Sequence, residues 1–197
     1  MRMIAVVVSS IDGYITKHDT GATSWASAED QQHFFGFLRS CDVSVMGGET
    51  YRASRPAILS EVVARRDRQA SEEARPRRKI VWTRDPDTYA PDGVPGLLEF
   101  TNEPLQTVVA ALRRDGHQRC AVLGGGEVYG AMLAADLIDE IVLTLEPLTF
   151  GTGVRHTGTG HMIDGRFSLA GVERLNTDTL LLTYVRPEPP DGRAKPS

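Results

Sequence analysis

Three consecutive glycines stand in the segment of the chain best suited to hold an anion. Residues 121–129 read Ala-Val-Leu-Gly-Gly-Gly-Glu-Val-Tyr, so an apolar run stops at Gly124, Gly125 and Gly126 before helix-forming residues follow. Glycine has no Cβ, so its peptide N–H groups can approach a phosphate closely, and the N-terminus of the next helix adds positive partial charge. A tight turn between strand and helix is the simpler alternative, but a turn needs fewer glycines. We therefore interpret this segment as a phosphate-binding loop.

Two other strand ends carry residues of the same chemistry. One apolar run ends at Gly47 and Gly48, with Thr50 just beyond, and another ends at Thr83 and Arg84. A hydroxyl and a guanidinium group are suited to an additional phosphate, although Arg84 equally fits a solvated loop. The triple glycine matches neither the dinucleotide fingerprint G-x-G-x-x-G nor a Walker loop. These loops therefore predict a phosphate-bearing ligand without naming it.

The elements that must position these loops follow from hydrophobic periodicity. Short apolar runs predict strands at residues 3–8, 43–46, 79–82, 97–100, 120–123 and 138–145, and a closing hairpin at 167–175 and 179–186. Helices are predicted at 28–39 with Ser27 as N-cap, at 105–112 from an apolar stripe, and at 127–134. From Arg52 to Arg78 we expect irregular structure, with at most a solvated helix over 61–73.

Alternating strands and helices predict a single α/β domain with a mixed, mostly parallel sheet and an antiparallel C-terminal hairpin. Ligands of such sheets bind outside the carboxyl ends of the strands, so the loops after Val8, Met46, Trp82 and Leu123 are expected to form one site. The domain should span residues 1–186. Residues 187–197, rich in proline and charge, are expected to be a disordered tail.

Composition and charge limit the classes of partner that we expect this protein to bind. The chain has 197 residues, of which 41% are hydrophobic, and a net charge of -4, which argues against nucleic-acid binding. The sequence has no run of membrane-spanning length and no signal peptide pattern, so we expect a cytoplasmic protein. The two cysteines are expected to be reduced core thiols, and the five histidines lack metal-ligand spacing, so no metal is predicted.

Four motifs in this order resemble the dihydrofolate reductase superfamily and, within it, the RibD C-terminal-like reductase family of riboflavin biosynthesis. They are residues 10–15 (Ser-Ile-Asp-Gly-Tyr-Ile), 45–51 (Val-Met-Gly-Gly-Glu-Thr-Tyr), 122–129 (Val-Leu-Gly-Gly-Gly-Glu-Val-Tyr) and 137–144, followed by Gly-Thr-Gly at 151–153. The resemblance covers the chain up to its tail. It implies a dihydrofolate reductase-like, three-layer α/β/α sandwich that binds NADPH across the strand ends.

The resemblance also implies roles for individual residues. Val8 and Ile15 would offer backbone groups to the nicotinamide carboxamide, and Trp82, Thr83 and Arg84 would line the adenosine end. The pyrophosphate region would be held by Gly47, Thr50, Gly124, Gly125, Gly126, Glu127, Val128 and Tyr129. A cis peptide bond is expected between Gly124 and Gly125.

Substrate contacts are expected from Val6, Trp25, Gln31, Phe35, Leu123 and Thr144. Folate enzymes carry an acidic residue one turn before the stacking aromatic, which here is Phe35. Gln31 occupies that position and Asp30 is adjacent, so the proton source is either Asp30 or a bound water. Trp25 either closes over the nicotinamide or packs its loop.

Two departures from the riboflavin enzymes bear on the substrate. Their Asp-Pro-Arg phosphate-binding motif is reduced here to Ser54-Arg55-Pro56. The arginines at 65–78 could hold a substrate phosphate, but most of them are expected to form a solvated face. The chain also lacks the zinc deaminase signature, so it would be a stand-alone reductase.

The resemblance thus implies NADPH-dependent hydride transfer to a pyrimidine or pteridine-like substrate, foremost 5-amino-6-(5-phosphoribosylamino)uracil. Reduction of folate or another small heterocycle, and non-catalytic nucleotide binding, remain the alternatives. Homodimers are common in the riboflavin branch, and the sequence leaves the oligomeric state open.

Overall fold

The computed structural model describes residues 1–21, 23–68 and 77–187, whose strands form one eight-stranded sheet in the order β4-β3-β2-β5-β1-β6-β8-β7. The parallel strands are β1 (Arg2–Ser10), β2 (Val43–Gly47), β3 (Arg78–Trp82), β4 (Leu98–Thr101), β5 (Arg119–Val122) and β6 (Glu140–Glu146). The hairpin strands β7 (Ser168–Arg174) and β8 (Leu180–Val185) run antiparallel and join the sheet at β6. The predicted mixed sheet with a terminal hairpin is confirmed. The predicted tail lies outside the described residues except for Pro187.

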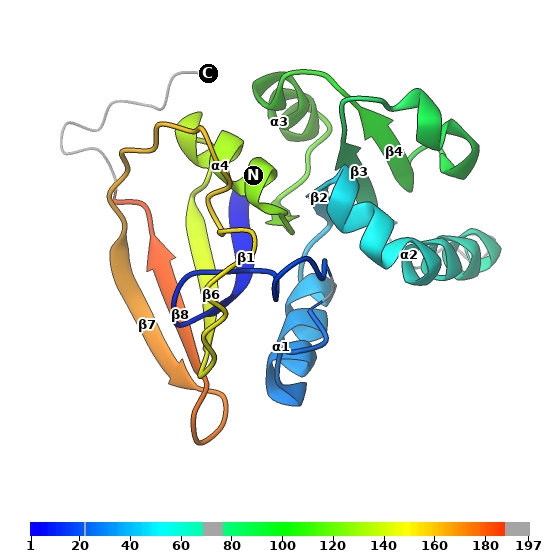
Figure 1. Ribbon diagram of the computed structural model, residues 1–197. Coiled ribbons are helices and arrows are strands. Elements are labelled where there is room, and N and C mark those ends of the chain that lie inside the picture. Colours follow the sequence, from blue (N-terminus) through cyan, green and yellow to red (C-terminus); the bar gives the residue numbers. More distant parts are fainter. Residues whose placement is uncertain (22, 69–76, 188–197) are drawn as a thin grey trace.

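Helices cover both faces of the sheet (Figure 1). On one face α3 (Leu105–Arg114) and α4 (Gly126–Ala134) bury Val109, Leu112 and Met132 against alternate residues of β1, β2 and β5. On the other face α1 (Ala28–Arg39) and α2 (Gly48–Arg68) pack on the intervening strand residues. Side chains of successive strand residues point to opposite faces, so these short apolar strands supply two cores. The predicted three-layer α/β/α sandwich is therefore confirmed.

The helix α2 corrects the sequence prediction for residues 52–78. It starts directly at the end of β2 and runs through Gly48–Arg68, whereas we expected irregular structure and at most a solvated helix over 61–73. Pro56 lies inside it, and prolines normally break helices because they lack the N–H and crowd the preceding turn. Its buried residues Tyr51, Ile58 and Val62 are spaced at helical intervals but are diluted by charged neighbours. Residues 69–76 lie outside the described part of the chain.

A short 3-10 helix, η1 (Asp87–Asp92), was not predicted, and it holds the first two turns of α2. Arg55 on α2 makes a two-point contact with the Asp92 carboxylate, at 2.7 and 2.8 Å, and the Tyr51 hydroxyl donates to the same group at 2.7 Å. These contacts fix the helix over β3 and β4.

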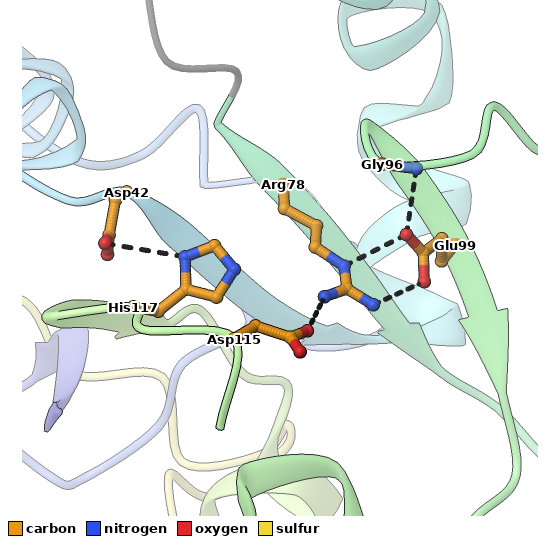
Figure 2. A network of polar contacts seen from close by, with 6 residues as sticks. All are labelled: Asp42, Arg78, Gly96, Glu99, Asp115 and His117. Carbon is orange, nitrogen blue, oxygen red and sulfur yellow. Dashed lines mark hydrogen bonds and ion pairs between the residues drawn. The ribbon is translucent and has the colours of Figure 1, made fainter. Parts of the chain in front are cut away.

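The amino ends of the strands are joined by a second polar network (Figure 2). Arg78, at the start of β3, donates to both oxygens of Glu99 at 3.0 and 2.8 Å and to Asp115 at 2.6 Å. Asp42, just before β2, accepts the N–H groups of Gln118 and Arg119 at 2.8 and 3.0 Å. The network therefore stabilises the sheet edge opposite the predicted ligand site. Among the described residues no helix is long and apolar enough to cross a membrane.

Candidate functional site

A large cavity lies where the predicted loops meet. It has a volume of about 1670 Å³ and is bordered by the carboxyl ends of β1, β2, β3 and β5, the helices α1 and α2, and the start of α4. Of the predicted site residues it is lined by Val6, Val8, Ile15, Asp30, Gln31, Phe35, Gly47, Thr50, Trp82, Thr83, Arg84, Leu123, Gly125, Gly126, Glu127, Val128 and Tyr129. Three of the predicted site residues do not line the cavity: Gly124, Trp25 and Thr144.

The three glycines of the loop after β5 have different surroundings. Gly124 has a φ of +81°, and a Cβ there would lie 2.4 Å from the Tyr129 ring. A Cβ on Gly126 would lie 2.6 Å from the Arg155 carbonyl oxygen. A Cβ on Gly125 would meet only the Thr50 hydroxyl, at 3.5 Å, so this glycine faces the opposite loop across the cavity. The peptide bond between Gly124 and Gly125 is cis, as the resemblance implied.

Two helix N-termini face the same cavity. The amides of Val128 and Tyr129 already donate to the Gly125 carbonyl, at 3.0 and 3.1 Å, while the amides of Gly126 and Glu127 precede the first intrahelical bond of α4. Helix α2 likewise starts at the end of β2, and Gly47 N–H donates to the Gly124 carbonyl at 2.6 Å, which joins the two glycine loops. Backbone donors and helix dipoles from both loops therefore favour a phosphate between them.

The end of β3 forms one wall of the cavity. Thr83 lies against the start of α2, where a Cβ on Gly48 would be 3.0 Å from its hydroxyl oxygen. The Trp82 indole donates to the Glu103 carbonyl at 3.0 Å, which fixes its ring beside the cavity. The Arg84 side chain is exposed and lines the cavity next to Thr83. The predicted hydroxyl and guanidinium group thus lie together at this strand end.

The segment after β6 brings a cation that sequence analysis did not single out. The Arg155 guanidinium stacks 4.9 Å above the Tyr14 ring, and its backbone packs on Gly126 at the start of α4. It lines the cavity beside the predicted phosphate loop. The Glu127 carboxylate contacts His161 at 3.2 Å and accepts Thr159 N–H at 3.3 Å, so it holds this segment in place. The sequence signal for Arg155 was its position two residues after the Gly-Thr-Gly motif.

Asp12 connects two of the motifs quoted above, residues 10–15 and residues 151–153. Its carboxylate accepts the Gly151 N–H at 2.7 Å and the Ser10 hydroxyl at 2.6 Å. The Ser10 hydrogen bond and then the Gly151 amide lower the pKa of Asp12 below its ordinary value. The loop after β1 is thereby fixed to the segment after β6. In the same region the Ile15 N–H donates to the Val154 carbonyl at 2.8 Å, so this amide is engaged within the protein.

The part of the cavity beside α1, where the sequence predicts substrate contacts, contains a buried carboxyl group. Asp30 is 7% exposed, lies in the first turn of α1 and lines the cavity. Burial raises the pKa of Asp30, and Glu146 raises it further, while a hydrogen bond with Thr144 and the charge of His33 act in the opposite direction. Gln31 and Phe35 lie at the exposed mouth of the cavity on the same helix. A carboxyl group with a raised pKa can hold a proton for catalysis closer to neutral pH.

Glu146, which sequence analysis missed, supports this region from behind. One carboxylate oxygen accepts the N–H and the hydroxyl of Ser27, at 2.8 and 2.7 Å, and the other accepts the Thr179 hydroxyl at 2.8 Å. Ser27 in turn caps α1 by accepting the Asp30 N–H at 3.2 Å. Glu146 therefore links β6 and β8 to the start of the helix that carries Asp30. Its only sequence signal was an acidic residue that ends an apolar strand.

Two other predicted site residues, Trp25 and Tyr129, are held by contacts within the protein. The Trp25 ring packs edge-on against Phe150 with centroids 5.0 Å apart, in agreement with the loop-packing alternative. The Tyr129 hydroxyl is buried and donates to the Val6 carbonyl, so it ties α4 to β1. Tyr129 therefore shapes the glycine loop, and its ring edge lines the cavity.

The mixed sheet, the two glycine-to-helix junctions and the cavity at the strand ends define an α/β domain with one candidate ligand site at the carboxyl ends of its strands. Residues 2–181 match the family model described as the RibD C-terminal domain, and the chain therefore belongs to this family. A curated relative, the Bacillus subtilis protein YwjB, is 25% identical over 156 residues, which are 78% of this chain and 80% of that protein.

Solved structures agree with this assignment at the level of the fold. A pyrimidine reductase-like protein from Corynebacterium diphtheriae superposes with a TM-score of 0.73 at 16% identity, covering 95% of this chain and 92% of that one. A diaminohydroxyphosphoribosylaminopyrimidine deaminase/5-amino-6-(5-phosphoribosylamino)uracil reductase from Thermotoga maritima gives 0.69 at 16% identity. The match covers 94% of this chain and 56% of that longer one.

Proposed function

We propose that this protein is an NADPH-dependent reductase that transfers a hydride to a pyrimidine or pteridine-like substrate, with activity of the 5-amino-6-(5-phosphoribosylamino)uracil reductase type. The supporting observation is the meeting of two glycine loops, two helix N-termini and the Thr83–Arg84 pair around one cavity. Members of the family use NAD(P)H.

The residues present fit this cofactor. Gly125 and Thr50 face each other across the gap between the loops, and a side chain on Gly125 would fill that gap. The amides of Gly126 and Glu127 and the Arg155 guanidinium would hold the pyrophosphate. Thr83 and Arg84 would hold a 2′-phosphate, which gives a reason to prefer NADPH over NADH.

When bound, the cofactor supplies the hydride. The protein aligns the acceptor, excludes water and supplies the accompanying proton. Phe35 and Gln31 at the cavity mouth would contact the substrate ring. Asp30, buried beside Thr144, would donate the proton to the nitrogen or oxygen atom that gains electron density as the hydride arrives at the adjoining C=N or ring-opened sugar carbon.

The test is a titration of the purified protein with NADPH and with NADH, followed by nicotinamide fluorescence. Saturable binding with NADPH preferred by at least about tenfold, and loss of that preference in Arg84→Gln, would support the proposal. The absence of saturable binding of either cofactor would refute it.

A second candidate, reduction of folate or another small oxidised heterocycle, is favoured by the position of Asp30 on the cavity wall. It predicts that Asp30→Asn abolishes turnover of such a heterocycle while NADPH affinity stays within about twofold. A substrate screen with phosphorylated and unphosphorylated heterocycles separates the two candidates.

A further inference from the structure

The cavity continues into a groove between α1 and α2 whose lining is strongly basic. A second hollow of about 330 Å³ lies there and shares Phe35, Leu38, Leu123, Glu61 and Lys79 with the main cavity. Its other lining residues are Arg39, Cys41, Val43, Ser44, Arg65 and Arg77. The groove is therefore an extension of the substrate end, on the far side of Phe35 from the cofactor loops.

The charges of this groove do not balance. Among its described lining residues four are basic, Arg39, Arg65, Arg77 and Lys79, and one is acidic, Glu61. Glu61 contacts Arg65 at 2.8 Å and Lys79 at 3.1 Å, so its carboxylate is shared by two cations. The whole chain carries a net charge of -4, so a local positive excess stands out against the overall composition.

The cations are also partly removed from water. Lys79 is 8% exposed, and burial lowers its pKa. The Glu61 carboxylate opposes this change, while the charges of Arg65 and Arg77 add to it. The pKa of Arg77 is likewise lowered by burial and then by Arg65 and Arg39. Like charges crowded beside a hollow repel one another, and a bound anion would relieve that repulsion. The solvated face expected for these arginines does not describe Arg65 and Arg77.

Arg55, which follows the Gly47–Gly48 loop in sequence, is paired with a carboxylate outside the cavity. Arg55, in the Ser-Arg-Pro remnant, is paired with Asp92 through two hydrogen bonds and does not line the cavity. Arg52, which does line the cavity from α2, is paired with Glu49 at 2.6 Å. Among the described residues, the basic groups next to Phe35 are those that line the groove. Ser44, at the base of the groove on β2, adds a neutral hydroxyl.

We propose that the groove between α1 and α2 binds an oxyanion carried by the substrate, a phosphate or a carboxylate, through Arg65, Arg77 and Lys79. This inference rests on the proposed function, since it assigns the far end of the same substrate. Glu61 acts as an internal counter-ion that holds the cations in place and competes with the ligand. The substrate is thus a molecule whose reducible carbon lies on the cofactor side of Phe35 and whose anionic group reaches past Phe35 into the groove.

The test uses the full-length protein labelled with ¹⁵N-arginine, titrated with inorganic phosphate and separately with malonate, at constant ionic strength kept with chloride. The Nε–H resonances of Arg65 and Arg77 should shift along one saturable curve. Saturation with phosphate alone would identify a phosphorylated substrate, and saturation with malonate alone a carboxylate. Absence of saturable shifts with both anions would overturn the proposal.

Three variants make the result specific. Arg77→Gln should weaken binding of the anion about tenfold, the loss of one charge-assisted contact, whereas the matched Arg114→Gln on the exposed end of α3 should leave it unchanged. Glu61→Gln should tighten anion binding about fivefold or more, because the competing carboxylate is gone. Weaker binding in Glu61→Gln, or unchanged binding in Arg77→Gln, would overturn the proposal.

Cofactor titrations of the same variants keep the two proposals apart. Arg77→Gln should bind NADPH as the unmodified protein does, because the groove lies beyond the cofactor loops. If NADPH does not bind but the anion curve depends on Arg77, the proposed function fails and the anion site stands. If NADPH binds and the anion curve is independent of Arg77, the anion site fails alone.

Discussion

The surroundings of Gly124 and Gly125 predict different effects when each is replaced by alanine. The first substitution should lower stability, and the second should lower cofactor affinity. Gly124→Ala places a residue with a Cβ at a φ of +81°, and that Cβ would lie 2.4 Å from the Tyr129 ring. The left-handed conformation costs about 1–2 kcal/mol and overpacking about 1–3 kcal/mol. The ring cannot easily yield, because Tyr129 is buried and its hydroxyl is bonded to the Val6 carbonyl. We expect the free energy of unfolding to fall by about 2–5 kcal/mol, and Tm by about 4–20 °C.

Gly125→Ala meets neither obstacle. Gly125 has a φ of -67°, which alanine adopts freely, and its Cβ would be in ordinary contact with the Thr50 hydroxyl at 3.5 Å. Stability should change by no more than about 1 kcal/mol, the effect of replacing a glycine N-cap by alanine. The methyl group would nevertheless narrow the gap between the two glycine loops, and NADPH affinity should fall about tenfold or more.

Urea unfolding and NADPH fluorescence titration of both variants measure the two effects separately. The reasoning is refuted if Gly125→Ala keeps the cofactor affinity of the unmodified protein, because the gap would then not hold the ligand. Unmodified stability in Gly124→Ala would equally contradict the assigned packing role. Gly116→Ala, at a φ of +81° with no atom within 4 Å of its Cβ, is the control for the backbone term alone.

Three further predictions concern the proposed proton donor Asp30, the cation Arg155 and Arg78 at the amino ends of the strands. Burial raises the pKa of Asp30 above 3.8, so its contribution to stability is present below that pH and is lost as pH rises through the folded-state pKa. Asp30→Asn should therefore unfold at higher urea than the unmodified protein at pH 8, with the difference shrinking toward pH 4; a constant difference would contradict this. Arg155→Gln should weaken NADPH binding about tenfold in fluorescence titrations, whereas Arg113→Gln on α3 should not. Arg78→Met removes the guanidinium group that contacts the carboxylates of Glu99 and Asp115, so calorimetry should show an unfolding free energy lower by about 1–3 kcal/mol with NADPH affinity unchanged.

The local sequence was sufficient to predict most strands of the sheet and the two glycine loops. The strands are short apolar runs bounded by polar residues, and the loop after β5 is contiguous, so its glycines and the following helix are visible in nine residues. The helix α2 was missed because Pro56 and a charged composition masked three buried residues spaced over three turns. A pattern that depends on tertiary packing carries a weak local signal.

The residues that sequence analysis missed share a different property. Glu146 is 119 residues from Ser27 in the chain, and Arg155 contacts Tyr14 from 141 residues away. Each is an isolated charged residue whose neighbours in sequence do not reveal its partner. Such residues acquire a role only through the pairing of strands, which here places the end of β6 beside that of β1.

The two ends of the cavity differ in how the chain builds them. The proposed cofactor end is built largely from two contiguous segments that begin helices, so backbone geometry decides its chemistry and side-chain changes alter it little. The substrate end is assembled from single side chains of α1, α2, β3 and β6, each of which can change alone: Asp30, Glu61, Lys79 and Glu146. Under the proposed function, substrate preference can therefore diverge within this fold while the proposed nicotinamide site is retained. For this chain the deciding feature is the positive excess of the groove between α1 and α2, because burial makes an unoccupied cluster of like charges costly. An anionic extension of the substrate is the occupant that best offsets this cost.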